Sequence, residues 1–169
     1  MSLSMYKASI PVFIRGFENF LAILDKAEAH AKAKGFEADI LAQGRLAPDM
    51  FPLIKQIQIA SDIVKGGAAR LAGMDAPAYD DTEKSIADLK VRINKTIDFI
   101  KTVKATQVDG SENRAITVKT RTAEMHFKGQ AYLLDFVLPN FFFHLSMTYA
   151  ILRHNGVDIG KMDFLGDFS

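Results

Sequence analysis

The chain has 169 residues, of which 49% are hydrophobic and 24% charged, so it can bury a full core and is not a disordered protein. Its 21 basic and 20 acidic side chains are mixed along the sequence, which argues against a nucleic-acid surface, and the absence of cysteine excludes disulfides and thiolate chemistry. No apolar run reaches the ~18 residues of a membrane span, and the N-terminal residues lack the pattern of an export signal. We therefore expect a single cytoplasmic domain over residues 1–169, with no membrane or nucleic-acid partner.

Two amphipathic helices are expected in the first half of the chain. Apolar residues at spacings of three and four predict a helix within about residues 3–34, which Gly35 ends as a C-cap. Pro11 either opens the main part of this helix in its first turn or kinks a longer helix. The same spacing predicts a second helix that begins near residue 49 or 50 and ends at Gly73. The connection between them is expected to be ordered but irregular.

A third helix and a β-ribbon are expected next. Asp80 and Glu83 resemble a capping box, and one apolar face continues from them to about Lys104. Alternating residues then predict two short strands, 116–120 and 123–127. Because a two-stranded ribbon is marginally stable by itself, we expect it to pack across the helices.

The last helical region is expected to open at Gly129. Pro139 either begins the final helix after a short helix or turn, or bends one long helix. The tail is expected to be irregular, with Phe164 and Leu165 folded back onto the core. Four long helices and a small ribbon before the last one predict an all-α, bundle-like domain.

The final helix is apolar on nearly every side, yet it carries three polar side chains in a line. Asn140, His144 and Thr148 stack at i, i+4 and i+8. A helix of this kind is normally buried, and a buried polar group without a partner costs about 1–3 kcal/mol. The stripe therefore either completes an internal hydrogen-bond network or lines a site.

His144 is the strongest candidate for chemistry. It is either a satisfied core histidine or an imidazole that faces a cavity as a metal ligand or as a general acid or base. Asn140 is a competent hydrogen-bond partner, whereas Thr148 either bonds its own helix or lines the site. The remaining histidines are expected at the surface: His30, His126 and His154.

Three polar residues of the second helix are the other candidates for ligand binding. Gln56 falls inside the apolar arc, so its amide either finds partners in the core or faces His144 across the bundle. Gln58 and Asp62 share the opposite polar strip, which is either a solvated face or part of a site. The sequence has no spacing typical of a zinc site and no glycine loop of the phosphate-binding kind.

Four runs of sequence resemble a known family: RLAPDMFPLIKQIQIASD, ARLAG, LPNFFFH and YAILRHNGVDIGKMDFLG. Together they are similar to a bacterial, DinB-like family catalogued only as a domain of unknown function, within the DinB/YfiT-like superfamily of metalloenzymes. The resemblance covers nearly the whole chain. It implies a four-helix bundle of up-down-down-up type, often dimeric, with a site between the helices.

The resemblance also implies a metal site in typical members, which bind a divalent metal through three histidines. One histidine lies on the second helix, and two lie four residues apart on the last. Matching the family's L-R-x-x-G-V turn to residues 152–157 places His144 at the second of the last pair and Asn140 at the first. The second-helix position falls within residues 56–59, which contain no histidine, so two of the three ligands are absent.

Three functions remain open from the sequence. In the first, the protein binds a small polar molecule in an interhelical cavity lined by Gln56, Asn140 and His144. In the second, it is a metal-dependent thiol transferase or isomerase of DinB type. In the second case Gln58, Asp62 or a partner chain would supply the missing ligands. The third function is a non-catalytic dimerisation or interaction module, in which the stripe is a buried network. No cofactor is favoured, a divalent ion held partly by water remains open, and a homodimer is expected.

Overall fold

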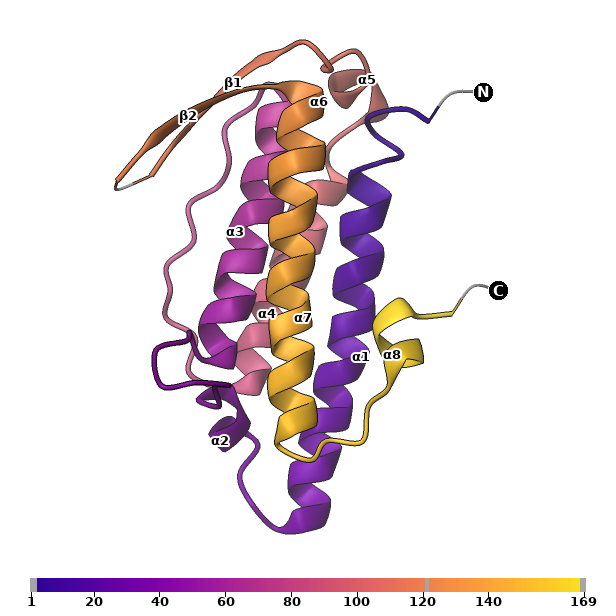
Figure 1. Ribbon diagram of the computed structural model, residues 1–169. Coiled ribbons are helices and arrows are strands. Elements are labelled where there is room, and N and C mark those ends of the chain that lie inside the picture. The colour runs from indigo at the N-terminus through magenta and orange to yellow at the C-terminus, as the bar shows by residue number, and fades with distance from the viewer. Residues whose placement is uncertain (1–2, 121, 168–169) are drawn as a thin grey trace.

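The computed structural model describes residues 3–120 and 122–167. Four long helices lie side by side along most of its length (Figure 1): α1 (Ile10–Lys34), α3 (Leu53–Ala72), α4 (Ile86–Lys101) and α7 (Leu138–His154). α3 packs against α4 and α7, and α1 also packs against both. Their apolar faces bury a hydrophobic core. Within the two described ranges, no helix is long and apolar enough to cross a membrane.

Shorter elements connect and cover the long helices. The strands β1 (Ala115–Lys119) and β2 (Glu124–Lys128) form an antiparallel ribbon, which projects from one end of the molecule (Figure 1). The other short elements are helical, and they are α2 (Asp39–Ala42), α5 (Ala105–Val108), α6 (Gly129–Ala131), the π-helix η1 (Tyr132–Val137) and α8 (Lys161–Leu165). The structure is thus mainly helical with one small sheet.

Proline residues set the starts of two helices. For Pro11 the first of the two alternatives is confirmed, because α1 begins at Ile10 with Pro11 in its first turn. α3 begins at Leu53 rather than near residue 49 or 50, because Pro52 adopts an extended conformation at the N-cap. A proline has no N–H to donate, which suits the first turn of a helix but not its interior.

The predicted helix ends are confirmed for α1 and α3. Gly35 and Gly73 are C-caps with φ values of 75° and 70°, a left-handed conformation that glycine adopts without the steric cost of a Cβ atom. The connection between these helices contains the short α2, so it is less irregular than expected. α4 ends at Lys101, three residues before the predicted end.

The predicted capping box of α4 is wrong. The N-cap is Ser85, whose side chain accepts from the Asp88 N–H, while the Asp88 carboxylate accepts from the Ser85 N–H. The carboxylate of Glu83 instead accepts hydrogen bonds from Arg92 and from Gln58. A tertiary ion pair therefore determines the role of Glu83, and the local sequence pattern does not.

The β-ribbon is confirmed, with Ile116 opposite Phe127 and Val118 opposite Met125. The connection between its strands is longer than predicted, because residues 120 and 123 lie outside the strands. Phe127 packs against Tyr132 at a ring-centroid distance of 5.6 Å. The inner face of the ribbon therefore covers the start of the last helical region, as expected.

The helical region from Gly129 to His154 is continuous. Pro139 lies inside this region, where α7 begins directly after a π-helix. α6, η1 and α7 follow one another without a break, and Pro139 lies in the first turn of α7. The tail then folds back and forms α8, where Phe164 packs edge-on against Phe20 and Tyr149. The predicted return of the tail to the core is confirmed, although the tail contains a short helix.

Candidate functional site

His144 and Gln56 meet at the contact between α7 and α3. His144 is 8% exposed and Gln56 only 2%. The His144 Nδ1 atom lies 2.7 Å from Gln56 Oε1. Of the alternatives left open for Gln56, the structure thus shows the one in which its amide faces His144 across the bundle. Both side chains fall inside the apolar arcs that the two helices bury against each other.

The Gln56 amide determines which nitrogen of His144 carries the proton. Its Nε2 group donates to the backbone carbonyl of Phe51 at 3.1 Å. The reverse amide orientation would place two acceptor oxygens together at that point, so Oε1 must face His144. Because Oε1 only accepts hydrogen bonds, Nδ1 of His144 is the donor and Nε2 is an unprotonated acceptor.

The second ring nitrogen of His144 is free and reaches the surface. Among the described residues, none bonds to Nε2, and this atom does not belong to the fully buried polar atoms that lack a partner. Burial lowers the pKa of His144 below its ordinary value, which favours the neutral ring. The arrangement can therefore accept a hydrogen bond or take up a proton.

We expect the lowered pKa of His144 to make the free energy of unfolding fall in weak acid. Below about pH 6.5 the unfolded chain protonates this histidine while the folded protein does not, so folding loses free energy as the pH decreases. Urea unfolding at several pH values should show a shallower fall for His144→Gln than for the wild type. The other histidines are the same in both proteins, so parallel curves would contradict the prediction.

The other two polar residues of the α7 stripe bond to their own helix. Asn140 donates to the carbonyl of Phe136 at 2.7 Å, and the buried Thr148 hydroxyl donates to the carbonyl of His144 at 2.9 Å. Of the two alternatives for Thr148, the structure thus shows the hydrogen bond to its own helix. Asn140 remains partly exposed one turn from His144 and keeps an oxygen that can accept.

Gln58 and Asp62 belong to a different cluster, centred on Arg92 of α4. The Arg92 side chain is 1% exposed, and it bonds to Asp62 Oδ1 at 3.1 Å and to Glu83 Oε1 at 3.0 Å. Gln58 donates to Glu83 Oε2 at 2.8 Å. Of the two alternatives for this strip, the solvated face is therefore wrong for Gln58, which is buried, whereas Asp62 is half-exposed.

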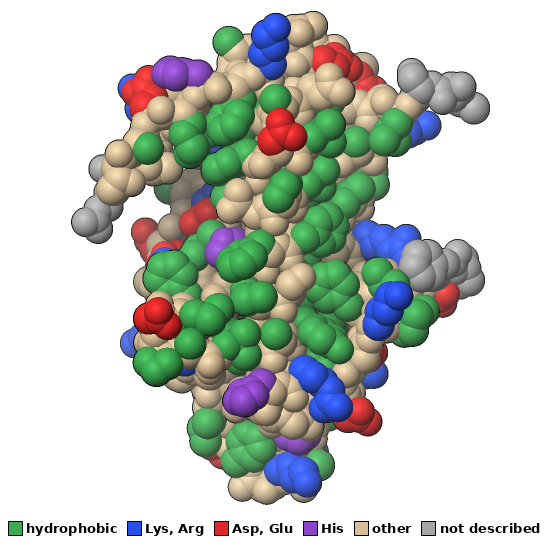
Figure 2. All heavy atoms as spheres, in the orientation of Figure 1, with side chains coloured by type: hydrophobic (Ala, Val, Ile, Leu, Met, Phe, Trp, Pro, Cys, Tyr) green, Lys and Arg blue, Asp and Glu red, His purple; other side chains and the backbone are tan. Residues whose placement is uncertain are grey.

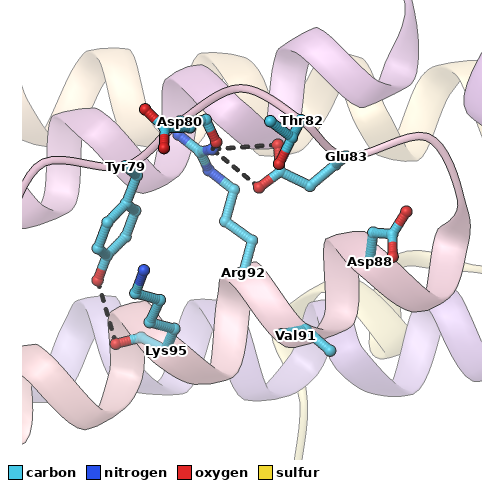
Figure 3. A pocket seen from close by; sticks show the side chains of 8 residues that line it. All are labelled: Tyr79, Asp80, Thr82, Glu83, Asp88, Val91, Arg92 and Lys95. Atoms are coloured by element: carbon cyan, nitrogen blue, oxygen red, sulfur yellow. Dashed lines mark hydrogen bonds and ion pairs between the residues drawn. The ribbon is translucent and has the colours of Figure 1, made fainter.

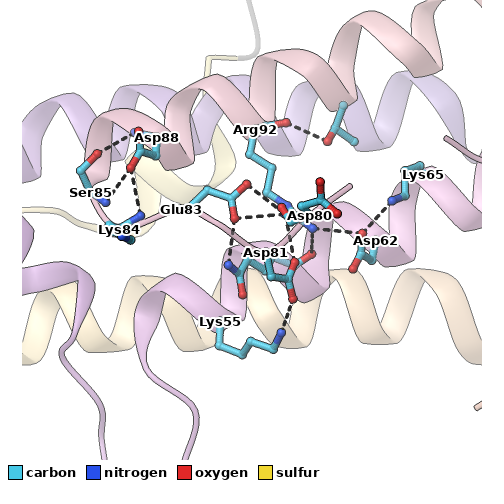
Figure 4. Close-up of polar contacts among 12 residues, drawn as sticks. Lys55, Asp62, Lys65, Asp80, Asp81, Glu83, Lys84, Ser85, Asp88 and Arg92 are labelled. Carbon is cyan, nitrogen blue, oxygen red and sulfur yellow. Dashed lines mark hydrogen bonds and ion pairs between the residues drawn. The ribbon is translucent and has the colours of Figure 1, made fainter. Parts of the chain in front are cut away.

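This cluster fastens the long loop between α3 and α4 onto both helices (Figure 4). From the loop, Asp81 pairs with Arg92 at 3.1 Å and with Lys55 at 2.5 Å. Sequence reasoning did not identify Arg92 as a core residue. The signal that could have found it is its position one residue before Ile93 and three after Leu89, inside the apolar stripe of α4.

Beside the cluster, an open cavity of about 310 Å³ lies between the loop and α4 (Figure 3). Tyr79 stands at one end, with the Lys95 ammonium 4.2 Å from its ring centroid and the Lys65 ammonium 3.9 Å away. Burial raises the pKa of Tyr79 above its ordinary value. On the cavity wall, Arg92 and Glu83 already bond to each other. Most of the other lining residues are exposed, so the groups left for a ligand are mainly solvated ones.

The residues around His144 do not fit the three-ligand metal site of the resemblance. Its neighbour Gln56 supplies an amide, a weak ligand for zinc-type metals, in place of imidazole or carboxylate. Across residues 3–120 and 122–167, no group of three or more histidine, aspartate or glutamate side chains is placed to hold a metal ion. His126 and His154 are exposed as predicted, and His30 is partly buried against Phe36.

The fold is that of the DinB-like class of helical proteins. A crystal structure described as that of a DinB family member from Shewanella denitrificans superposes with a TM-score of 0.88 and 36% sequence identity, covering 96% of this chain and 92% of that one. The chain belongs to the family described as domain of unknown function DUF1993, whose model matches residues 5–165. The comparison with curated proteins gave no match.

Proposed function

We propose that the protein binds a small polar molecule at the surface between α3 and α7 where His144 presents its free Nε2. The observation that carries the proposal is this nitrogen, an acceptor to which none of the described residues bonds, on a ring that is otherwise buried. Gln56 positions the ring, and the free oxygen of Asn140 lies one turn away. The proposed binding site does not include the other three candidates from the sequence. Gln58 and Asp62 belong to the Arg92 cluster, and Thr148 bonds to its own helix.

The same geometry supports a role in proton transfer. A neutral imidazole held by one hydrogen bond at Nδ1 can take a proton at Nε2 from a bound molecule, and Gln56 Oε1 then stabilises the charged ring. His144 would be the general base, and Gln56 a positioning residue. A metal-dependent thiol transfer reaction is not part of the proposal, because the donor groups around His144 do not fit a divalent metal.

A metabolite screen by thermal shift tests the proposal on the wild type and on His144→Ala. A compound that raises the melting temperature of the wild type but not of the folded variant supports a site at His144. His126→Ala, a change at an exposed histidine of the ribbon, is the matched control and should respond as the wild type does. Stabilisation that is equal in all three proteins would place the ligand elsewhere.

We expect Gln56→Leu to lower the free energy of unfolding by about 1–3 kcal/mol, because it leaves the buried Nδ1–H of His144 without an acceptor. Urea unfolding measures the effect, and Gln130→Leu, at an exposed glutamine of α6, should change stability by less than about 0.5 kcal/mol. A neutral or stabilising Gln56→Leu would mean that the amide is not needed for packing.

A second candidate function, an interaction module that pairs two copies of the chain, is favoured by the exposed face of α7. Phe142 and Phe143 are 38% and 54% exposed there, and hydrophobic side chains gather over the middle of α7 with charges mostly at the margins (Figure 2). An apolar surface of this kind is typical of interfaces.

Sedimentation analysis tests this homodimer. Phe143→Ser should shift it toward monomer, while Val91→Ser, a change at an exposed apolar residue of α4, should not. A monomeric wild type would exclude the module as described.

We also infer that the chain forms a single domain, in which the four long helices follow the up-down-down-up order. The support is the long connection from Gly73 to Ser85, which runs along α3 before α4 begins (Figure 1). A connection of this length allows two successive helices to run in the same direction.

A further inference from the structure

The chemistry around His144 also restricts the class of ligand, and this step rests on the proposed function. We infer that the site takes an uncharged molecule that donates an O–H or N–H hydrogen bond from an aromatic body, as a phenol does. Three observations lead to this class: the direction of the hydrogen bond, the absence of charge on the stretch of α7 around His144, and the exposed aromatic ring of Phe143 beside it.

The ligand must be the donor. The chain of bonds from the Phe51 carbonyl through the Gln56 amide to His144 Nδ1 has one consistent direction, which leaves a lone pair on Nε2. A molecule with only acceptor groups would face this lone pair with its own. The bond therefore requires a hydroxyl or an N–H group on the ligand.

The stretches of α7 and α3 that carry His144 and Gln56 offer a charged ligand no free counter-ion. The stretch of α7 from Leu138 to Leu152 contains no aspartate, glutamate, lysine or arginine. On α3, the ammonium groups of Lys55 and Lys65 are paired with Asp81 and Asp62 at the Arg92 cluster. An anion or a cation beside His144 would lose hydration without gaining an ion pair from these two stretches, which is unfavourable.

An exposed aromatic ring beside His144 supplies the apolar part of the site. The Phe143 ring is 54% exposed and lies edge-on to His144, with centroids 5.2 Å apart. The side chains over this part of α7 are mainly hydrophobic (Figure 2). A flat apolar ligand covers such a surface favourably while its polar group reaches the imidazole.

Three probes of similar size separate the classes: p-cresol, which donates a hydrogen bond, 4-methylanisole, which cannot, and the anion p-toluate. At about pH 8 the phenol remains protonated, and long-range ¹H–¹⁵N spectra report both ring nitrogens of His144 in the wild-type protein. We expect p-cresol to shift the Nε2 resonance saturably while Nδ1 stays protonated. 4-Methylanisole should bind about tenfold more weakly, the effect of one lost hydrogen bond.

The outcomes distinguish this inference from the proposed function. If p-toluate binds at His144 as well as p-cresol does, the ligand class is wrong and the site remains. If none of the three probes shifts Nε2, the ligand class is also wrong, and the metabolite screen decides the proposed function separately. A spectrum in which Nε2 carries the proton in the free protein would overturn the inference directly, without any variant that might fail to fold.

Discussion

Replacing Arg92 with methionine should lower the free energy of unfolding by about 3–5 kcal/mol, the largest effect that we expect from one side chain. The change leaves Glu83, whose side chain is 11% exposed, as a buried carboxylate without its cation. Asp81 and Asp62 keep Lys55 and Lys65 as partners, so Glu83 accounts for most of the loss. Urea unfolding followed by circular dichroism measures the effect.

Two further variants show whether the unpaired charge is the cause. In the Arg92→Met background, Glu83→Leu should restore much of the lost stability, because it removes the buried charge that the first change left unpaired. Lys90→Met changes an ion pair with Asp25 on the same helix bundle, but this pair is partly solvated, so a loss below about 1 kcal/mol is expected. Equal losses for Arg92→Met and Lys90→Met would contradict the role assigned to the Arg92 cluster.

Gly129→Ala is the second substitution for which we expect a large effect, a loss of about 3 kcal/mol at the upper end of the range for overpacking. A methyl group at Gly129 would overlap the backbone carbonyl oxygen of Ser111. That carbonyl cannot withdraw easily, because it accepts a hydrogen bond from the Arg114 N–H at 3.0 Å, and the adjacent Glu112 carbonyl accepts from Gln130. The turn between α5 and β1, which contains Ser111, would have to move away from the first turn of the last helical region.

Gly160→Ala is the matched control for this prediction. A methyl group at this position would have no atom within 4 Å outside its immediate neighbours, and the backbone has a φ of −132° that any residue adopts. The change should alter the melting temperature and the unfolding free energy very little, by less than about 0.5 kcal/mol. A Gly129→Ala protein as stable as Gly160→Ala would show that the turn around Ser111 is not held closely against Gly129.

Periodicity predicted the long helices because each of them buries one stripe against a common core. The apolar stripes of α1, α3 and α4 coincide with their buried residues, and Gly35 and Gly73 end two of these helices as expected. The starts of α3 and α4 were less accurate. Glu83 has the local features of a capping residue, but a buried guanidinium offers its carboxylate a stronger partner than a helix N-terminus does.

The candidate site was predictable in part. Gln56 and His144 were recognisable because each is a polar residue inside an apolar arc, where a partner is required. The same rule was not applied to Arg92, whose long side chain is usually exposed. Gln58 and Asp62 looked like a solvated strip because the loop that covers this face has no helical or strand pattern to reveal its path.

The sequence by itself determined the helical class, the ribbon, the helix ends at glycine and the position of Gln56 and His144 inside apolar arcs. All of these follow from local spacing and from the need to bury apolar surface. The tertiary structure alone decided the direction of the hydrogen bonds at His144 and the ion pairs that hold the loop at Arg92. Those depend on atoms up to 88 residues apart in the chain, and only the folded arrangement brings such atoms within a few ångströms of each other.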